Sequence, residues 1–202
     1  MSKVIEFEGV GNEENVMRIG GMSFLPEGME WPVNPNGEKM VLILNIPTNF
    51  LNDKLAYNYP KDKMISVFTT YNSEDYFLDT IVYHGSSEEL TNIKTGFTKV
   101  ILHDIGISRN DSDYLIPARK LIVGEESDFM DECGASHLGG KPLLLQNENL
   151  EVDNYQFCLQ IYGGDFPEEF QDIFYLNDSI GYLFLKGEPD ANDIGMFFTQ
   201  CS

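Results

Sequence analysis

Three blocks of this sequence occur twice in the same order, and this repeat limits the chain to folds with two related halves. Residues 19–25 resemble residues 138–144 around a Gly-Gly pair, while two apolar runs that follow the first pair, 42–46 and 64–68, reappear as 157–161 and 180–184. The offset between partners is nearly constant. We therefore expect an internal duplication, with repeats at about 15–102 and about 134–202, inside a single domain of residues 1–202.

Each block also indicates a local structure. Gly20-Gly21 and Gly139-Gly140 suit tight turns that need a positive φ or a close backbone approach, each followed directly by a strand. The repeated apolar runs are rich in branched and aromatic side chains, which is typical of buried strands. The same reasoning predicts further strands in the runs at residues 75–84, 96–103 and 194–202.

Helices are expected to be few and short. Residues 124–132 predict one, with Ser127 as its N-cap, and residues 166–174 predict another, with Pro167 at its first position. No Pro-, Gly- or Ser-rich linker separates the two repeats, so they are expected to share one core. The predicted fold is mainly β with a minor α component, built from internally duplicated β-sheet halves.

Charge narrows the classes of partner. The chain has 33 acidic and 13 basic residues, a formal net charge of −20. This balance excludes nucleic acid and an anionic membrane surface, because both require a basic footprint. Two interpretations remain: a solvated surface that keeps the protein soluble, or long-range attraction to a basic protein such as a ribosomal protein or a toxin domain.

Cysteine use and the N-terminal segment indicate a cytoplasmic protein. The chain has an odd number of cysteines, Cys133, Cys158 and Cys201, and they have no Cys-x-x-Cys spacing. Neither a disulfide framework nor a structural zinc site is therefore expected. The N-terminal residues contain no continuous apolar stretch of the kind that a signal peptide needs. No run approaches the roughly 18 apolar residues of a membrane helix.

No pattern identifies catalytic chemistry, a metal ligand or a cofactor. His84 has Ser86 and Ser87 close by, but no Gly-x-Ser-x-Gly elbow and no phosphate-binding glycine loop occurs. Cys133 and His137 would suit a nucleophile pair or two metal ligands, although a loop cysteine and a histidine bonded to backbone are commoner. Acidic pairs such as Glu88-Glu89 are most simply explained as solvated charges.

Trp31 is the only tryptophan of the chain. One interpretation is an anchor under which the Gly-Gly turn packs. The other is an aromatic hot spot on a binding face. The sequence leaves both open.

Several short motifs resemble the YwqG-like family of bacterial proteins. The first is Gly-Gly-x-x-x-Leu-Pro at residues 20–26 with Trp31-Pro32, and the second is His-Leu-Gly-Gly-x-Pro at 137–142. "CLQI" at 158–161, "DSIGYLFL" at 178–185 and the closing "FTQCS" at 198–202 extend the resemblance. It implies a mainly β, duplicated fold and a distant kinship with eukaryotic programmed-cell-death and Tsr-type proteins, which chaperone a newly made ribosomal protein. The zinc-binding cysteine clusters of those relatives are missing here.

Together these observations predict a non-enzymatic, acidic protein-binding module, chaperone-like or immunity-like toward a basic partner. The alternative is a small hydrolase-like enzyme with a His/carboxylate site that no motif reveals. A cleft lined by histidine and carboxylates would favour the enzyme. The candidate binding residues are Trp31, Gly20, Gly21, Gly139, Gly140 and His137. The repeated strands also predict a nearly fully buried set, Leu44, Ile46, Phe68, Leu159, Ile161 and Phe184.

Overall fold

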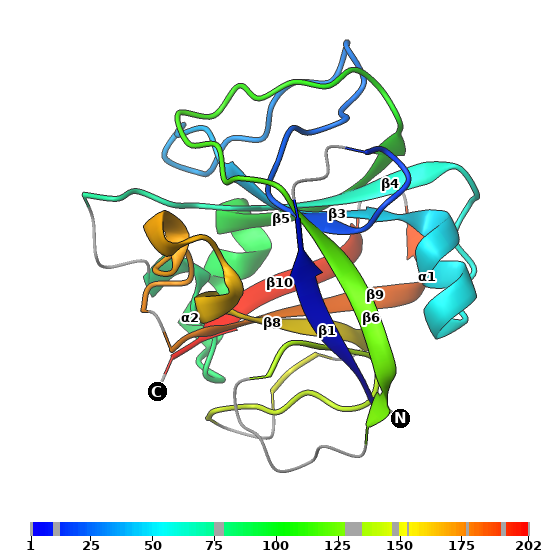
Figure 1. The fold of residues 1–202 in the computed structure, drawn as a ribbon. Helices are drawn as coiled ribbons and strands as arrows, with labels where there is room; N and C mark the ends of the chain where they lie inside the picture. The colour runs from blue at the N-terminus through cyan, green and yellow to red at the C-terminus, as the bar shows by residue number, and fades with distance from the viewer. Residues whose placement is uncertain are drawn as a thin grey trace.

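Ten strands form one antiparallel sheet in the computed structural model, which describes residues 2–9, 13–74, 79–127, 135–146, 150–152, 154–176, 178–190 and 193–201. The strand order is β10-β9-β8-β7-β1-β6-β2-β3-β4-β5, and the sheet curls so that its two end strands lie side by side (Figure 1). The strands are β1 Ser2–Glu8, β2 Arg18–Ile19, β3 Val41–Pro47, β4 Lys63–Thr69, β5 Thr98–Asp104, β6 Arg119–Ser127, β7 His137–Leu138, β8 Gln156–Tyr162, β9 Ile180–Asp190 and β10 Asp193–Gln200. The mainly β fold expected from the sequence is confirmed.

Helical segments are short and lie between strands. They are α1 Thr48–Leu55, η1 Asp79–Ile81, α2 Ser87–Asn92, the π-helical turn η2 Ile93–Phe97, η3 Gly163–Asp165 and η4 Glu168–Phe170. Helix α1 begins directly after Pro47 and ends at Ala56, whose left-handed φ of 55° terminates it. None of the helices in the described ranges has the length and apolar character needed to cross a bilayer.

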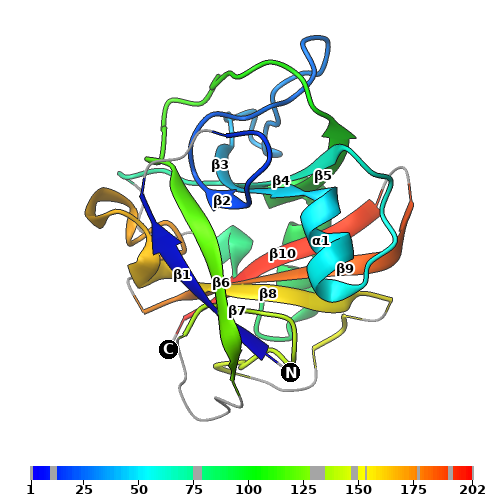
Figure 2. The same cartoon turned by 45° about the vertical axis from the view of Figure 1, so that its right-hand side comes forward.

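The strand order is symmetric about its centre. If each strand of β1–β5 is replaced by its counterpart in β6–β10, and the reverse, the order read from the other end is unchanged. The first strand of each half lies beside the second strand of the other half. Strand β1 pairs with β6 and β7, and β6 pairs with β1 and β2. In Figure 2 the β1–β6 pair runs along the front and joins the half-sheet β2–β5 to the half-sheet β7–β10.

Matching irregularities occur in both half-sheets. The β3–β4 ladder shifts register between Leu42 and Leu44, and the β8–β9 ladder shifts between Phe157 and Leu159. These are partner positions of the sequence repeat. A bulge adds one residue and increases the local twist, so the two half-sheets bend at corresponding points.

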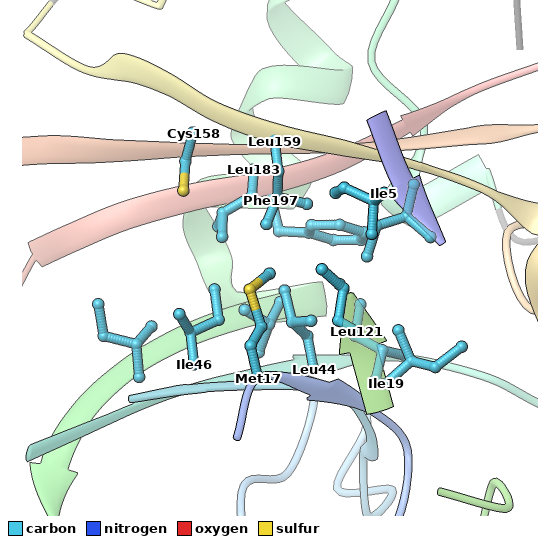
Figure 3. Close-up of a cluster of buried hydrophobic side chains, with 14 of the residues drawn as sticks. Ile5, Met17, Ile19, Leu44, Ile46, Leu121, Cys158, Leu159, Leu183 and Phe197 are labelled. Atoms are coloured by element: carbon cyan, nitrogen blue, oxygen red, sulfur yellow. The ribbon is translucent and has the colours of Figure 1, made fainter. Parts of the chain in front are cut away.

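The main core lies between the two half-sheets. Leu159, Leu183 and Phe197 point from one side toward Leu44 and Ile46 on the other (Figure 3). Each half-sheet also has a smaller apolar cluster on its outer face, beneath the connecting segments. The six side chains that the repeat predicts to be buried are at most 4 % exposed, so this prediction is confirmed.

Several local predictions are wrong. No strand directly follows either Gly-Gly pair; instead the chain crosses the outer face of each half-sheet, where Leu25 is fully buried and Leu144 packs on apolar side chains. In the run at residues 75–84, residues 75–78 lie outside the described ranges and the next three form η1. These apolar runs are buried against the sheet as connecting segments rather than as strands of it, which accounts for both errors.

The two predicted helices also differ from the structure. Residues 124–127 are the end of β6, and residues 128–132 lie outside the described part of the chain. In the second segment only η4 forms, with Pro167 as its N-cap residue. Phe166, Phe170 and Phe174 are all buried in the main core cluster, so tertiary contacts rather than helical hydrogen bonds hold this segment.

Candidate functional site

Two hollows with opposite charge lie on either side of the segment that connects β4 to β5. The larger, of about 650 Å³, lies where η2, β5 and β10 meet, and among the described residues Lys94, Lys99 and Asp193 are the charged ones that line it. The smaller, of about 370 Å³, is the acidic pocket, lined by Asp79, Val82, His84, Ser86, Glu88, Glu89, Asn92, Tyr175 and Cys201. The acidic pocket is thus a cleft lined by a histidine and carboxylates.

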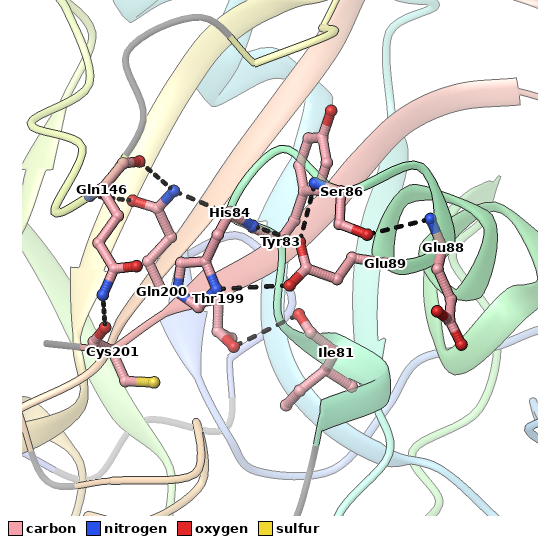
Figure 4. A network of polar contacts seen from close by, with 10 residues as sticks. All are labelled: Ile81, Tyr83, His84, Ser86, Glu88, Glu89, Gln146, Thr199, Gln200 and Cys201. Atoms are coloured by element: carbon pink, nitrogen blue, oxygen red, sulfur yellow. Dashed lines mark hydrogen bonds and ion pairs between the residues drawn. The ribbon is translucent and has the colours of Figure 1, made fainter.

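The start of α2 fixes one wall of the acidic pocket. Ser86 Oγ accepts a hydrogen bond from the Glu88 backbone N–H at 3.2 Å, while Glu89 Oε2 accepts from the backbone N–H groups of Ser86 at 3.1 Å and His84 at 2.7 Å (Figure 4). This reciprocal arrangement is a capping box. Its Ser-x-x-Glu pattern is legible in the sequence and would have located this helix start.

His84 completes this wall. Its Nδ1 atom lies 3.6 Å from Glu89 Oε1, and its ring is about three-quarters buried. The Glu89 carboxylate therefore contacts both the backbone N–H and the ring of His84. Asp79 and Glu88 are exposed and lie at the rim.

The opposite wall comes from the end of β10. The Gln200 amide donates to the carbonyl oxygens of Tyr83 at 3.0 Å and Gln146 at 2.9 Å, and it anchors the strand end beneath the pocket (Figure 4). Cys201 follows, with a half-buried side chain. Burial, and then the nearby Asp79 carboxylate, raise the pKa of the Cys201 thiol. The thiol is therefore kept protonated, which is the opposite of what an activated nucleophile requires.

The predicted glycines form structural turns. Gly20 and Gly21 have φ values of 60° and 76°, and Gly139 and Gly140 have 68° and 76°. The N–H of Gly20 donates to Ile43 O at 3.0 Å, and that of Gly139 donates to Cys158 O at 2.8 Å. None of these glycines lines either hollow.

His137 is also held within the fold. It is 5 % exposed, its Nδ1 lies 3.1 Å from Gly139 O, and its ring packs against Phe157 at 5.4 Å. Burial lowers its pKa, which favours the neutral ring. Cys133, the partner considered from the sequence, lies outside the described residues.

Trp31 belongs to the outer cluster of the first half. Its Nε1 donates to Met40 O at 2.9 Å, and its ring meets Phe68 edge-on with centroids 5.3 Å apart. With 7 % of its surface exposed, Trp31 fills the space beneath the loop that follows the Gly-Gly turn. This packing supports the anchor interpretation.

One Ser-His contact was not anticipated from the sequence. Ser66 Oγ lies 2.8 Å from His103 Nε2, and His103 Nδ1 lies 2.7 Å from Asp104 O. A carbonyl can only accept, so Nδ1 carries the proton, while the Ser66 hydroxyl donates to Asn45 Oδ1 at 2.6 Å. Both side chains are buried, and neither lines one of the two hollows, so the pair has no access to a substrate there.

Metal binding finds no support within the described part of the chain. There, no three His, Cys, Asp or Glu side chains are grouped so that they could hold an ion.

Comparison with known proteins identifies a family. No curated protein matches the chain. One family model, described as "Domain of unknown function (DUF1963)", matches residues 17–148, which begin just before β2 and end shortly after β7. The match covers both Gly-Gly turns, the acidic wall at α2 and strand β6, whereas β1 lies before it. The chain therefore belongs to the DUF1963 family.

Proposed function

We propose that this chain is a non-enzymatic protein-binding module of the YwqG-like type, that it acts in the cytoplasm, and that its acidic pocket takes a lysine or arginine side chain from a basic partner. The observation that carries this proposal is the pocket lining: three carboxylates and no lysine or arginine among the described residues. A cationic side chain placed there would gain hydrogen bonds assisted by charge.

The overall charge supports the same partner. A net charge of −20 attracts a basic protein over longer distances and accelerates association. The pocket adds a place where one cation is bound. A newly made ribosomal protein, as for the chaperone-like relatives suggested by the sequence motifs, and a basic toxin domain, in an immunity-like role, are the two partner classes of this proposal.

The two-half architecture is part of the proposal. We infer that the symmetric strand order, the matching bulges and the two Gly-Gly turns come from duplication of one β-rich unit. The segment of residues 79–97, which supplies one wall of both hollows, lies between β4 and β5; the corresponding connection, between β9 and β10, spans only residues 191–192. The segment of residues 79–97, which lines both hollows, is then an insertion present only in the first half.

A hydrolase-like enzyme is the alternative. His84, Glu89 and Cys201 share the acidic pocket, and this co-location is the observation in its favour. Against it, the raised pKa of Cys201 favours the thiol form, and Glu89 already accepts two backbone N–H groups. The geometry therefore supports binding better than nucleophilic catalysis.

Two charge-matched double variants test the proposal. We expect Asp79→Asn/Glu88→Gln to weaken binding of a short lysine- and arginine-rich peptide about tenfold, since two partly exposed ion pairs contribute roughly 0.2–1 kcal/mol each. Glu168→Gln/Glu169→Gln removes the same charge from η4, outside the pocket, and should weaken binding less than about threefold. Fluorescence anisotropy measures both.

Salt provides the second arm of that test. Binding should weaken steeply between 0.1 M and 1 M salt, where the Debye length falls from about 10 Å to about 3 Å. Equal losses in the two double variants would show that only net charge matters, and salt-independent binding would rule out the electrostatic proposal. Loss of Cys201 alkylation on peptide binding would locate the peptide at the pocket.

A further inference from the structure

The two end strands of the sheet meet without closing it. Strands β5 and β10 run antiparallel, with Thr98 opposite Phe197 and Val100 opposite Gly195. We call the space between residues 98–102 and 193–197 the seam. Along it, Thr98 Oγ1 donates to Phe197 O at 2.6 Å, but β5 and β10 are not paired in a ladder.

Backbone polar groups on both strands are directed into the seam. Phe97 O accepts from Thr70 N on the β4 side, and the direction alternates along a strand, so the N–H and C=O groups of Val100 point the other way. On β10, Phe197 O accepts from Thr98, so Gly195, two residues before it, also directs its groups to the seam. Buried or half-buried backbone groups of this kind require partners.

Further along, the same edge of β10 already bonds to the end of η1 and the residues just after it. Tyr83 N donates to Thr199 O at 3.0 Å, Thr199 Oγ1 donates to Ile81 O at 3.3 Å, and Val82 forms a parallel bridge to Thr199. Residues 81–83 therefore cover one end of this edge. At the other end, beside Gly195, the 650 Å³ cavity takes the place of a pairing segment.

The charge of the cavity differs from that of the protein as a whole. Lys94 is exposed, and Lys99 donates to Val33 O at 2.7 Å while its side chain lines the cavity. Asp193 is compensated, because Lys186 lies 2.8 Å from its carboxylate and Tyr155 donates to it at 2.8 Å. The lining thus presents two lysines that favour an acidic side chain.

We propose that the seam binds an extended peptide segment of a partner protein, which adds as a strand along the seam-facing groups of Val100 and Gly195 and places an acidic side chain beside Lys94 and Lys99. Main-chain hydrogen bonds would provide affinity, as in other cases of strand addition. Binding parts β5 from β10 at this end, while the Thr98–Phe197 bond holds the other end. This site is separate from the acidic pocket and does not depend on the proposed function.

A defined peptide tests this site on the full chain. The probe is a seven-residue peptide of alternating threonine and valine with a central glutamate, blocked at both ends, at 0.15 M salt, where charges more than about 8 Å apart are screened. We expect hydrogen exchange at the amides of Val100 and Gly195 to slow at least about tenfold on binding. The amides of residues 41–47 should be unaffected.

Controls separate strand pairing from simple charge attraction. A peptide with alternate amides N-methylated keeps its charge but cannot pair, and it should lose binding at least about tenfold. Lys94→Glu should weaken binding about tenfold or more, whereas Lys61→Glu, an exposed lysine that lines neither hollow, should have little effect. Equal binding of the N-methylated peptide, protection at other strands, or no binding at about 1 mM peptide would overturn the proposal.

Discussion

The two Gly-Gly turns have nearly the same backbone but different side chains in front of them. Arg18 precedes one turn and His137 the other, and both are buried. Arg18 Nη2 donates to Met22 O at 2.5 Å, and His137 Nδ1 donates to Gly139 O. Burial lowers the pKa of Arg18 to about 10, so it stays charged near neutrality, whereas His137 is favoured as a neutral ring.

This difference shows that the turn requires a particular backbone conformation but accepts different side chains at the position two residues before it. The left-handed φ values and the hydrogen bonds of Gly20 and Gly139 are common to both halves. The preceding position needs only a polar group long enough to reach a nearby carbonyl, because a buried acceptor left unpaired costs about 1–3 kcal/mol. Two chemically unlike residues therefore serve one backbone arrangement.

The largest expected effect comes from the paired phenylalanines of the outer clusters. Phe68 and Phe184 occupy partner positions of the repeat and are 0 % and 4 % exposed. We expect Phe68→Ala and Phe184→Ala each to lower the free energy of unfolding by about 3–5 kcal/mol. Because the two lie in separate clusters, the double variant should add within about 0.5 kcal/mol in urea titrations. A large departure from additivity would show that the halves are coupled through more than the shared core.

The next effect compares the first glycine of one turn with the second glycine of the other, which are not partner positions of the repeat. A Cβ on Gly20 would lie 2.6 Å from the Ile116 carbonyl oxygen, a backbone atom, whereas one on Gly140 would meet the side chain of Ser2 near the N-terminus. Gly20→Ala should cost about 3 kcal/mol, and Gly140→Ala about 1–2 kcal/mol. Gly28→Ala, which has open space and no positive φ, is the control and should change little. Thermal unfolding of the three variants gives the order, and equal losses at residues 20 and 140 would contradict it.

The smallest effect is a pH dependence that only one turn should have. The pKa of His137 is lowered in the folded state, so the unfolded chain binds more protons as the pH falls through about 6.5, and stability is lost in that direction. The loss is at most about 1.4 kcal/mol per pH unit for one histidine. His137→Asn should reduce the slope of unfolding free energy between pH 7 and 5, measured by urea titration at each pH.

A residual slope should remain in that variant, since burial also lowers the pKa of His103. Arg18, with a pKa of about 10, does not titrate in this range, so the first turn contributes nothing. An unchanged slope in His137→Asn would mean that the ring is not held neutral by the fold.

Strands buried on both faces were predictable from the sequence. All seven residues of β3 and most of β4 and β8 are buried, and such strands are near-continuous apolar runs that need no knowledge of their neighbours. Strands β1 and β6 escaped prediction because they carry Lys and Glu and are only partly covered. Their place in the sheet is set by pairing across the halves.

Some features of the candidate site were also predictable from the sequence, and others were not. The capping box at Ser86 and Glu89 is a local pattern, and the acidic composition is visible without any structure. The contact of this wall with Cys201, and the meeting of Val100 with Gly195, join residues about a hundred positions apart in the chain. No local propensity encodes such proximity.

The sequence by itself determined the mainly β fold class, the two Gly-Gly turns and the net charge, because each of these depends on residue type and short spacing. Tertiary structure decided where the apolar runs after the turns are buried, how the first strands exchange between halves, and which charged side chains meet in each hollow. These outcomes depend on the curvature and register of a ten-stranded sheet whose two ends meet. Register and curvature are set by contacts between distant segments, so they exist only once the chain has folded.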